Sequence, residues 1–182
     1  MAGDEGIRIH SSDPFATPAE LRDPARRFRA RLVAPVTVWT AAAADGRRTG
    51  ITVSSLTVVE GEPPVVMGVI GPVTDFWEAV GETKRFVVHA LDEDQRRVAD
   101  DFAGRNPGPD APFGSLATEE SEWGPLLADV ATRAYCRMGG FLEVGYFLMV
   151  RGDIDSFDLP DRPRPPLAHY RGDYVNVRPR PR

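Results

Sequence analysis

The chain has 182 residues, of which 42% are hydrophobic and 27% charged, and its formal net charge at pH 7 is −5. This balance predicts one globular domain and excludes a wholly disordered chain. The sequence contains no apolar run of the roughly 18 residues that a membrane-spanning helix needs, and the acidic net charge does not favour a nucleic-acid binder.

The cysteine count and the first residues predict a cytoplasmic protein. Cys136 is the only cysteine, so no intrachain disulfide and no cysteine-rich zinc site can form. Residues 1–10 carry Asp4 and Glu5 and lack the apolar stretch of a secretory signal. We therefore expect a reducing environment.

Two capping signals predict a short helical region before the first strand. Residues 1–16 show no periodicity and are expected to form a mobile arm. Thr17-Pro18 and Asp23-Pro24 each place a capping side chain before a proline at the first helical position. The apolar residues at helical spacing are Leu21, Ala25, Phe28 and Leu32. The arginines of this region are expected to form a helix face exposed to solvent, and a patch that collects phosphate is the alternative. They are Arg22, Arg26, Arg27, Arg29 and Arg31.

The remaining chain alternates β-rich stretches with turn signals. Asp45-Gly46 predicts a hairpin turn, and helices are expected from the Thr74 cap to residue 80 and from Asp92 to residue 103. Residues 105–125 resemble a loop. The expected strands cover residues 36–42, 50–59, 65–70, 86–91, 131–138 and 147–154, with a closing segment at 167–174.

This order of elements predicts a mainly β (α+β) fold, a barrel or sandwich with short flanking helices. We expect one domain over residues 17–175, followed by a solvated tail over 176–182. Residues 65–70 and 86–88 form nearly continuous apolar runs, so they are expected to be mostly buried.

The common catalytic motifs are missing from the sequence. There is no G-x-S-x-G, P-loop, G-x-G-x-x-G or HExxH pattern, and His10, His89 and His169 lie far apart. His89 is predicted to be a core or interface residue, and Cys136 a buried, inert thiol. We therefore assign no catalytic residue and no metal site, and expect a bound cofactor to supply any chemistry.

Residues 52–57 have the most unusual local composition. They place four hydroxyl groups on an otherwise apolar strand. Such hydroxyls can serve the polar atoms of a flavin ring or a phosphate. A strand face exposed to solvent explains the same composition equally well.

Several motifs, in their order along the chain, resemble the flavin reductase-like family with the FMN-binding split-barrel fold. The resemblance covers roughly residues 25–175. It rests on Gly50 to Thr57 followed by Glu62-Pro63-Pro64, on Phe86 to Leu91 followed by Asp94-Gln95 and Asp101 to Gly104, on Phe28 with Val36 to Ala41, and on Pro166 to Tyr174.

This resemblance implies a homodimeric split β-barrel that binds FMN, or FAD, near the subunit interface. NADH or NADPH would deliver hydride to the flavin, and reduced flavin would pass to a partner monooxygenase. Carried over by position, the flavin-binding residues are Thr52, Val53, Ser54, Ser55, Leu56 and Thr57 at the ring, Thr74 with Lys84 or Arg85 at the phosphate, and Phe102 and Phe113 beside the flavin. The nicotinamide would approach His169, Tyr170, Arg171 and Gly172.

One position departs from the family pattern. Many flavin reductases carry Gly-Asp-His after the penultimate strand, and the histidine helps to place the nicotinamide. This chain has Gly145-Tyr146-Phe147 instead. Phe147 can stack on a nicotinamide but cannot donate a hydrogen bond.

Three functions follow as hypotheses. The first is an NAD(P)H-dependent flavin reductase, because hydride transfer between two rings needs positioning rather than a catalytic triad. The second is a non-reductase FMN-binding electron-transfer or flavin-storage protein of the same fold, which the missing histidine favours. The third is a β-barrel binding domain without flavin.

Overall fold

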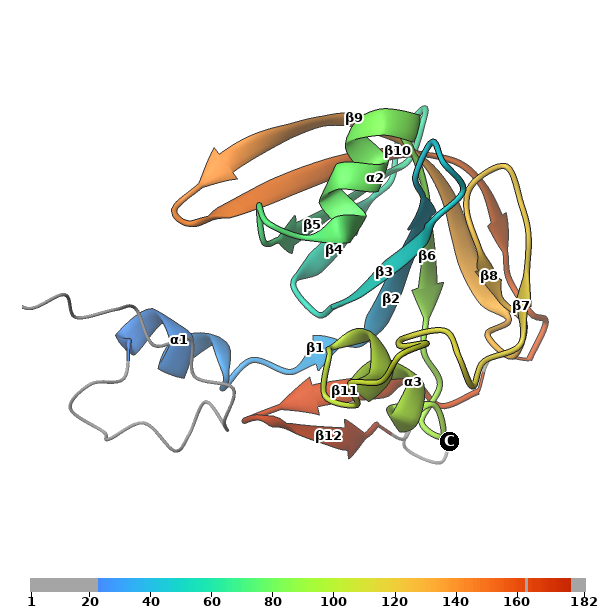
Figure 1. Cartoon of the computed structure of the whole chain (residues 1–182). Coiled ribbons are helices and arrows are strands. Elements are labelled where there is room, and N and C mark those ends of the chain that lie inside the picture. Colours follow the sequence, from blue (N-terminus) through green and yellow to red (C-terminus); the bar gives the residue numbers. More distant parts are fainter. Residues whose placement is uncertain (1–22, 163, 178–182) are drawn as a thin grey trace, which may run out of the picture.

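A seven-stranded antiparallel sheet forms the body of the molecule. The computed structural model describes residues 23–162 and 164–177. The sheet has the strand order β3-β2-β6-β9-β10-β5-β4. Figure 1 shows that it curls strongly, so that it forms a split barrel with short helices outside it. The predicted fold class is therefore confirmed. The strands of this sheet are β2 (Thr37–Ala42), β3 (Arg48–Val53), β4 (Leu56–Val59), β5 (Val65–Ile70), β6 (Arg85–Ala90), β9 (Thr132–Val144) and β10 (Phe147–Asp158).

The sheet's two edge strands are consecutive in the chain. β3 ends at Val53 and β4 begins at Leu56, yet β3 pairs with β2 while β4 pairs with β5 at the opposite edge. The single strand predicted over residues 50–59 is therefore wrong. Because the sheet curls, Ser54 and Ser55 carry the chain across the split from one edge to the other.

Smaller elements cover the ends of the barrel. A three-stranded sheet has the order β1-β11-β12, and β7 pairs with β8. The hairpin of β7 and β8 begins inside the loop that was predicted over residues 105–125. The bounds are β1 (Ala34–Pro35), β7 (Thr118–Glu119), β8 (Leu126–Leu127), β11 (Leu167–Tyr170) and β12 (Asp173–Asn176).

Three helices flank the sheet in the described residues, and the caps of the first two follow the predicted signals. In α1 (Pro24–Arg29) the Asp23 carboxylate accepts the Ala25 N–H, and in α2 (Asp75–Thr83) the Thr74 hydroxyl accepts the Trp77 N–H. The predicted apolar face of α1 does not reach the core, since the helix has no buried residue. The cap predicted at Thr17 and the arm predicted over residues 1–16 lie outside the described residues.

The third helix, α3 (Arg96–Phe102), begins later than predicted. The Gln95 side chain accepts the Asp92 N–H at 2.8 Å and donates to the Asp129 carbonyl at 2.7 Å. These bonds hold residues 92–95 in a turn, so the helix starts at Arg96. No helix of the described residues is long and apolar enough to cross a membrane.

Aromatic rings fill the interior of the curled sheet. The rings of Trp39 and Phe86 stack with centroids 5.1 Å apart, and Phe76 of α2 meets Phe86 edge-on at 6.0 Å. A Cβ atom at Gly68 would lie 2.5 Å from the Trp39 ring, and one at Gly152 would lie 2.4 Å from the Phe86 ring. These glycines let the strands approach the rings.

His89 is fully buried and satisfied by the backbone. Its Nδ1 lies 3.2 Å from the Val38 carbonyl, and its Nε2 accepts the Leu127 N–H at 3.2 Å. This arrangement requires a neutral ring with its proton on Nδ1. Burial lowers the pKa of His89 to about 3. The ring therefore has a structural role, as predicted, and Cys136 is likewise buried, with its pKa raised by desolvation.

His89 should make the protein less stable as the pH falls below 6.5. The unfolded chain binds a proton at this residue near pH 6.5, whereas the folded chain binds it only near pH 3. Unfolding is therefore favoured between these values by about 1.4 kcal/mol per pH unit. Urea unfolding at pH 7.5, 6.5, 5.5 and 5.0 measures the slope. His89→Gln keeps a donor and an acceptor but does not titrate, and equal slopes in the two proteins would contradict this assignment.

Candidate functional site

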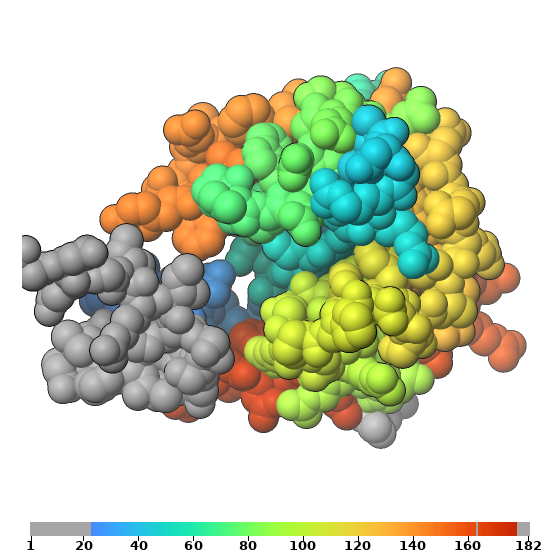
Figure 2. Space-filling model, in the orientation of Figure 1, coloured from blue at the N-terminus to red at the C-terminus, as the bar shows by residue number. Residues whose placement is uncertain are grey.

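A cavity of about 800 Å³ opens where the curled sheet is split. It lies between α1, residues 54–57, one face of β5 and the turn that joins β11 to β12. In Figure 2 the surface is hollowed between the orange arm of β9 and β10 and the red C-terminal hairpin. Its apolar wall includes Leu32, Val33, Leu56, Met67, Val69 and Met149.

The cavity explains why β5 is only half buried. Val66 and Ile70 point into the core, whereas Met67 and Val69 face the cavity and are partly exposed. The expectation that residues 65–70 are mostly buried is therefore wrong for one face of the strand. The same expectation is confirmed for Phe86 to Val88, which are buried.

The hydroxyl-rich segment divides between the cavity and the interior. Ser54, Ser55, Leu56 and Thr57 line the cavity. The Thr52 hydroxyl instead donates to the Ala99 carbonyl of α3 at 2.7 Å, and Val53 is buried in the core. Four of the six residues predicted to line the flavin ring therefore border this cavity.

The opposite wall comes from the C-terminal hairpin. His169 and Gly172 line the cavity, and β11 pairs with β1 through His169 opposite Ala34. Arg171 and Gly172 have φ angles of 53° and 92°, which build a tight turn, and the Arg171 N–H donates to the Ala30 carbonyl at 2.8 Å. Burial, and then the charges of two arginines, lower the pKa of His169, so its ring is mostly neutral at pH 7.

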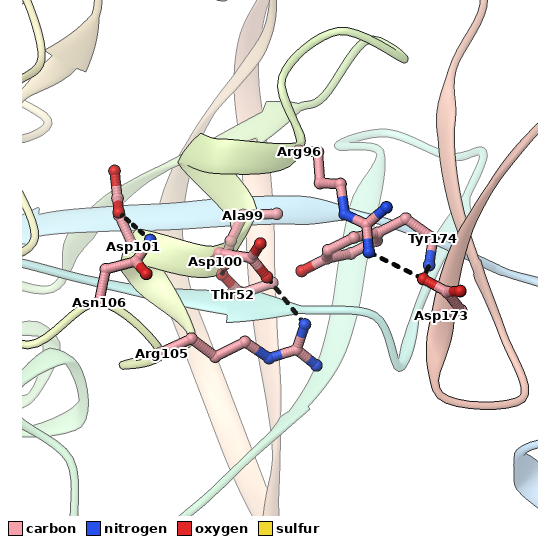
Figure 3. Close-up of polar contacts among 9 residues, drawn as sticks. All are labelled: Thr52, Arg96, Ala99, Asp100, Asp101, Arg105, Asn106, Asp173 and Tyr174. Atoms are coloured by element: carbon pink, nitrogen blue, oxygen red, sulfur yellow. Dashed lines mark hydrogen bonds and ion pairs between the residues drawn. The ribbon is translucent and has the colours of Figure 1, made fainter. Parts of the chain in front are cut away.

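A polar cluster holds this hairpin against α3, as Figure 3 shows. Tyr174 of β12 lies between two guanidinium groups, with Arg96 5.1 Å and Arg105 5.5 Å from its ring centre. Arg96 also pairs with Asp173, and Arg105 with Asp100, each at 2.8 Å. Burial and the neighbouring Asp100 raise the pKa of Tyr174 to about 12, so its hydroxyl stays protonated.

The predicted phosphate-binding residues lie outside the cavity. Thr74 caps α2, and Lys84 is exposed at the end of that helix. Arg85 pairs with Glu122 at 2.8 Å and lies over the Trp123 ring. The proposed role of these residues in phosphate binding stays a prediction.

Phe102 and Phe113 lie away from the cavity too. Their rings meet edge-on at 5.0 Å inside a second core cluster, which also contains Val36, Leu91 and Leu167. The guanidinium of Arg48 lies 4.9 Å from the Phe113 ring centre. Their contact with flavin stays a prediction.

Phe147 stands at the start of β10, next to the exposed hairpin tip. Met149 lines the cavity two residues further along the strand. Alternate residues of a strand share a face, so Phe147 lies on the cavity side of β10, half exposed. Tyr170 follows His169 on β11, and Arg171 is exposed in the turn.

The flavin and nicotinamide residues predicted from the sequence did not include the basic residues of the cavity, for which a solvated face was expected and a phosphate-collecting patch was the alternative. Arg26, Arg27 and Arg29 of α1 line the cavity. Their spacing placed them mostly away from the apolar residues of the helix, but nothing in the sequence showed that they face residues 54–57. Among the described residues, no group of three or more His, Cys, Asp or Glu side chains is arranged to hold a metal ion.

Comparison with known proteins identifies relatives along most of the chain. Residues 29–178 match the model of the flavin reductase like domain. The NADH:riboflavin 5'-phosphate oxidoreductase of Streptomyces pristinaespiralis is 33% identical over 171 residues, which cover 90% of this chain and 92% of that protein. The reductase component of the 4-nitrophenol 4-monooxygenase/4-nitrocatechol 2-monooxygenase of Rhodococcus opacus is 30% identical over 76% of this chain and 72% of its own.

Solved structures agree with this match. The nitrilotriacetate monooxygenase component B homologue from Mycobacterium thermoresistibile superposes with a TM-score of 0.76 at 26% identity, and the match covers 85% of each chain. Because the family model spans most of the sequence and a relative along nearly its whole length is one-third identical, the chain belongs to the flavin reductase-like family.

Proposed function

We propose that this protein is an NAD(P)H-dependent flavin reductase that binds the flavin ring in the cavity at the split of the barrel. The observation that carries the proposal is the composition of that cavity. Apolar side chains of β4 and β5 stand beside the hydroxyls of Ser54, Ser55 and Thr57. A flavin ring needs both, since it has flat apolar faces and a polar edge.

The chain's own residues bind and orient the two rings. Ser54, Ser55 and Thr57 serve the polar edge of the flavin, and Met67 and Val69 exclude water from its face. His169 faces the same space with a neutral ring that can make one directed hydrogen bond. Flavin, when bound, supplies the hydride-accepting ring that amino-acid side chains lack. Proximity and orientation are then the protein's main contribution.

FMN and NADH are the first pair to assay, because the Streptomyces relative is by name an NADH:riboflavin 5'-phosphate oxidoreductase. The Rhodococcus relative is by name a monooxygenase's reductase component. We therefore infer that reduced flavin leaves this protein for a partner monooxygenase. NADH oxidation that depends on added flavin is the expected result with the purified protein.

A non-reductase flavin protein is the second candidate, favoured by Phe147 in place of the family's histidine. The two functions differ in one measurement. Steady oxidation of NADH or NADPH with added FMN establishes the reductase. Flavin binding without any such oxidation would favour the electron-transfer or storage function.

Replacing Ser54 and Ser55 together by valine should weaken flavin binding at least tenfold. Each buried polar group of the flavin left without a partner costs about 1–3 kcal/mol. Quenching of flavin fluorescence measures the dissociation constant. Ser156→Val is the matched control, because it removes an exposed strand hydroxyl outside the cavity. An unchanged constant in the double variant would place the flavin elsewhere.

Phe147→His should lower the KM for NAD(P)H while flavin affinity stays nearly fixed. The new imidazole restores a directed hydrogen bond worth about 0.5–1.5 kcal/mol, which corresponds to roughly a two- to tenfold change. Steady-state kinetics at saturating FMN measures the effect. Leu159→His is the control, since that leucine is 69% exposed beyond the other end of β10 and does not line the cavity. Equal KM values in wild type and both variants would show that position 147 does not place the nicotinamide.

We further infer that the protein is a homodimer. The arm formed by the distal halves of β9 and β10 exposes a run of large apolar side chains, and Figure 1 shows the arm reaching beyond the sheet. A patch of this kind is typical of an interface with another protein. Its members are Phe141, Leu142, Val144, Tyr146 and Phe147.

Light scattering should give twice the chain mass of 20.0 kDa. Leu142→Glu should shift the protein to monomer, because it places a charge in the apolar arm. Leu159→Glu, at a similarly exposed leucine beyond the other end of β10, should leave the mass unchanged. A monomeric wild type at micromolar concentration would contradict the dimer.

A further inference from the structure

Three arginines of α1 border the cavity on the side facing residues 54–57. Arg26 and Arg29 lie three positions apart and so share one face of the helix, with Arg27 beside them. All three line the cavity. Among residues 23–162 and 164–177, none of their guanidinium groups forms an ion pair, whereas Arg137 and Arg164 are held by carboxylates at 2.6–3.0 Å.

Arg29 links α1 directly to the hydroxyl-rich wall. Its guanidinium donates to the Ser55 hydroxyl at 3.3 Å. A backbone hydrogen bond also holds the end of the helix against the C-terminal hairpin, since the Ala30 carbonyl accepts the Arg171 N–H at 2.8 Å. The arginine side chains therefore stand next to the segment proposed to hold the flavin ring.

The charge of this region is predominantly positive. Asp23 is the one carboxylate among the described lining residues, and its side chain accepts the Ala25 N–H as the helix cap. The charge of Arg29 also helps to lower the pKa of His169 across the cavity. A group that carries negative charge at pH 7 would be stabilised here.

We propose that Arg26, Arg27 and Arg29 bind a phosphate group of a nucleotide held in this cavity, either the flavin or the nicotinamide dinucleotide. The inference rests on the proposed function, and it places the phosphate at α1 rather than near Thr74 and Arg85, which lie outside the cavity. A guanidinium group matches phosphate oxygens in a bidentate geometry, which makes arginine well suited to this contact. The 5'-phosphate of the flavin and the phosphates of the nicotinamide dinucleotide share this chemistry.

The test compares flavins that differ only in the phosphate. Arg29→Gln and Arg26→Gln should each raise the dissociation constant of FMN about tenfold, and the constant for riboflavin should stay within about twofold. Arg31→Gln is the matched control, because it removes an equal charge from a residue just after α1 that does not line the cavity. Arg29→Lys, which keeps the charge, should recover part of the FMN affinity.

A second experiment distinguishes the flavin phosphate from the dinucleotide phosphates as the group that the arginines bind. With riboflavin as acceptor, a raised KM for NADH in Arg29→Gln but not in Arg31→Gln assigns the arginines to the dinucleotide.

Raising the KCl concentration should weaken the phosphate contact, and Arg29→Gln should reduce that salt dependence. The proposal is overturned if Arg29→Gln and Arg31→Gln have the same ratio of FMN to riboflavin affinity and the same KM for NADH. If the wild-type protein oxidises no NADH, the reductase function is refuted. The FMN and riboflavin affinities would still test whether the arginines bind phosphate.

Discussion

The stacked rings of Trp39 and Phe86 are the contact on which the shape of the molecule depends. The sheet wraps around this pair, and the strands that cross it carry Gly68 and Gly152, where a Cβ atom would meet a ring at 2.5 and 2.4 Å. Close approach on both sides lets the sheet curl until its two edge strands, β3 and β4, which are consecutive in the chain, come near each other. The core therefore determines where the barrel splits, and Ser54 and Ser55 lie at that split.

Helix α3 contacts segments of both cavity walls. Its Ala99 carbonyl accepts the Thr52 hydroxyl, two residues before the cavity-lining segment. Its Arg96 packs on Tyr174 of the hairpin that carries His169 and Gly172. The spacing between the walls is thus fixed by the fold before any ligand binds. A preorganised space of this kind suits a reaction that depends on holding two rings at a set distance.

Local signals predicted the elements well and their pairing less well. The Asp45-Gly46 turn and the Thr74 cap follow from chemistry that acts within a few residues. The break at Ser54-Ser55 could not be seen, because it depends on strands far along the sequence that bring the two edges together. The roles of Gly68 and Gly152 were hidden for the same reason, since only their aromatic neighbours show why a side chain is excluded.

The predicted residues of the candidate site also divide into those that the fold brings to the cavity and those that lie elsewhere. Ser54 to Thr57, His169 and Gly172 were predicted from motif order, and the fold brings them to one cavity. Motif order does not say which side of a strand or helix faces that cavity, and therefore Arg85 and Phe113 were grouped with them although they lie elsewhere.

The arginines show most clearly why composition alone cannot assign function. Lys84 is the only lysine in the chain, so arginine fills nearly every basic position whatever its task. What distinguishes these residues is the partner that the fold supplies. Arg137 lies beside Asp155, and Arg164 beside Asp92 and Asp94, so their charges are already matched. Arg26 and Arg29 instead stand over a cavity whose wall offers hydroxyls, and the described residues give them no carboxylate. A cation placed in this way has its strongest interaction with a charge that arrives with the ligand.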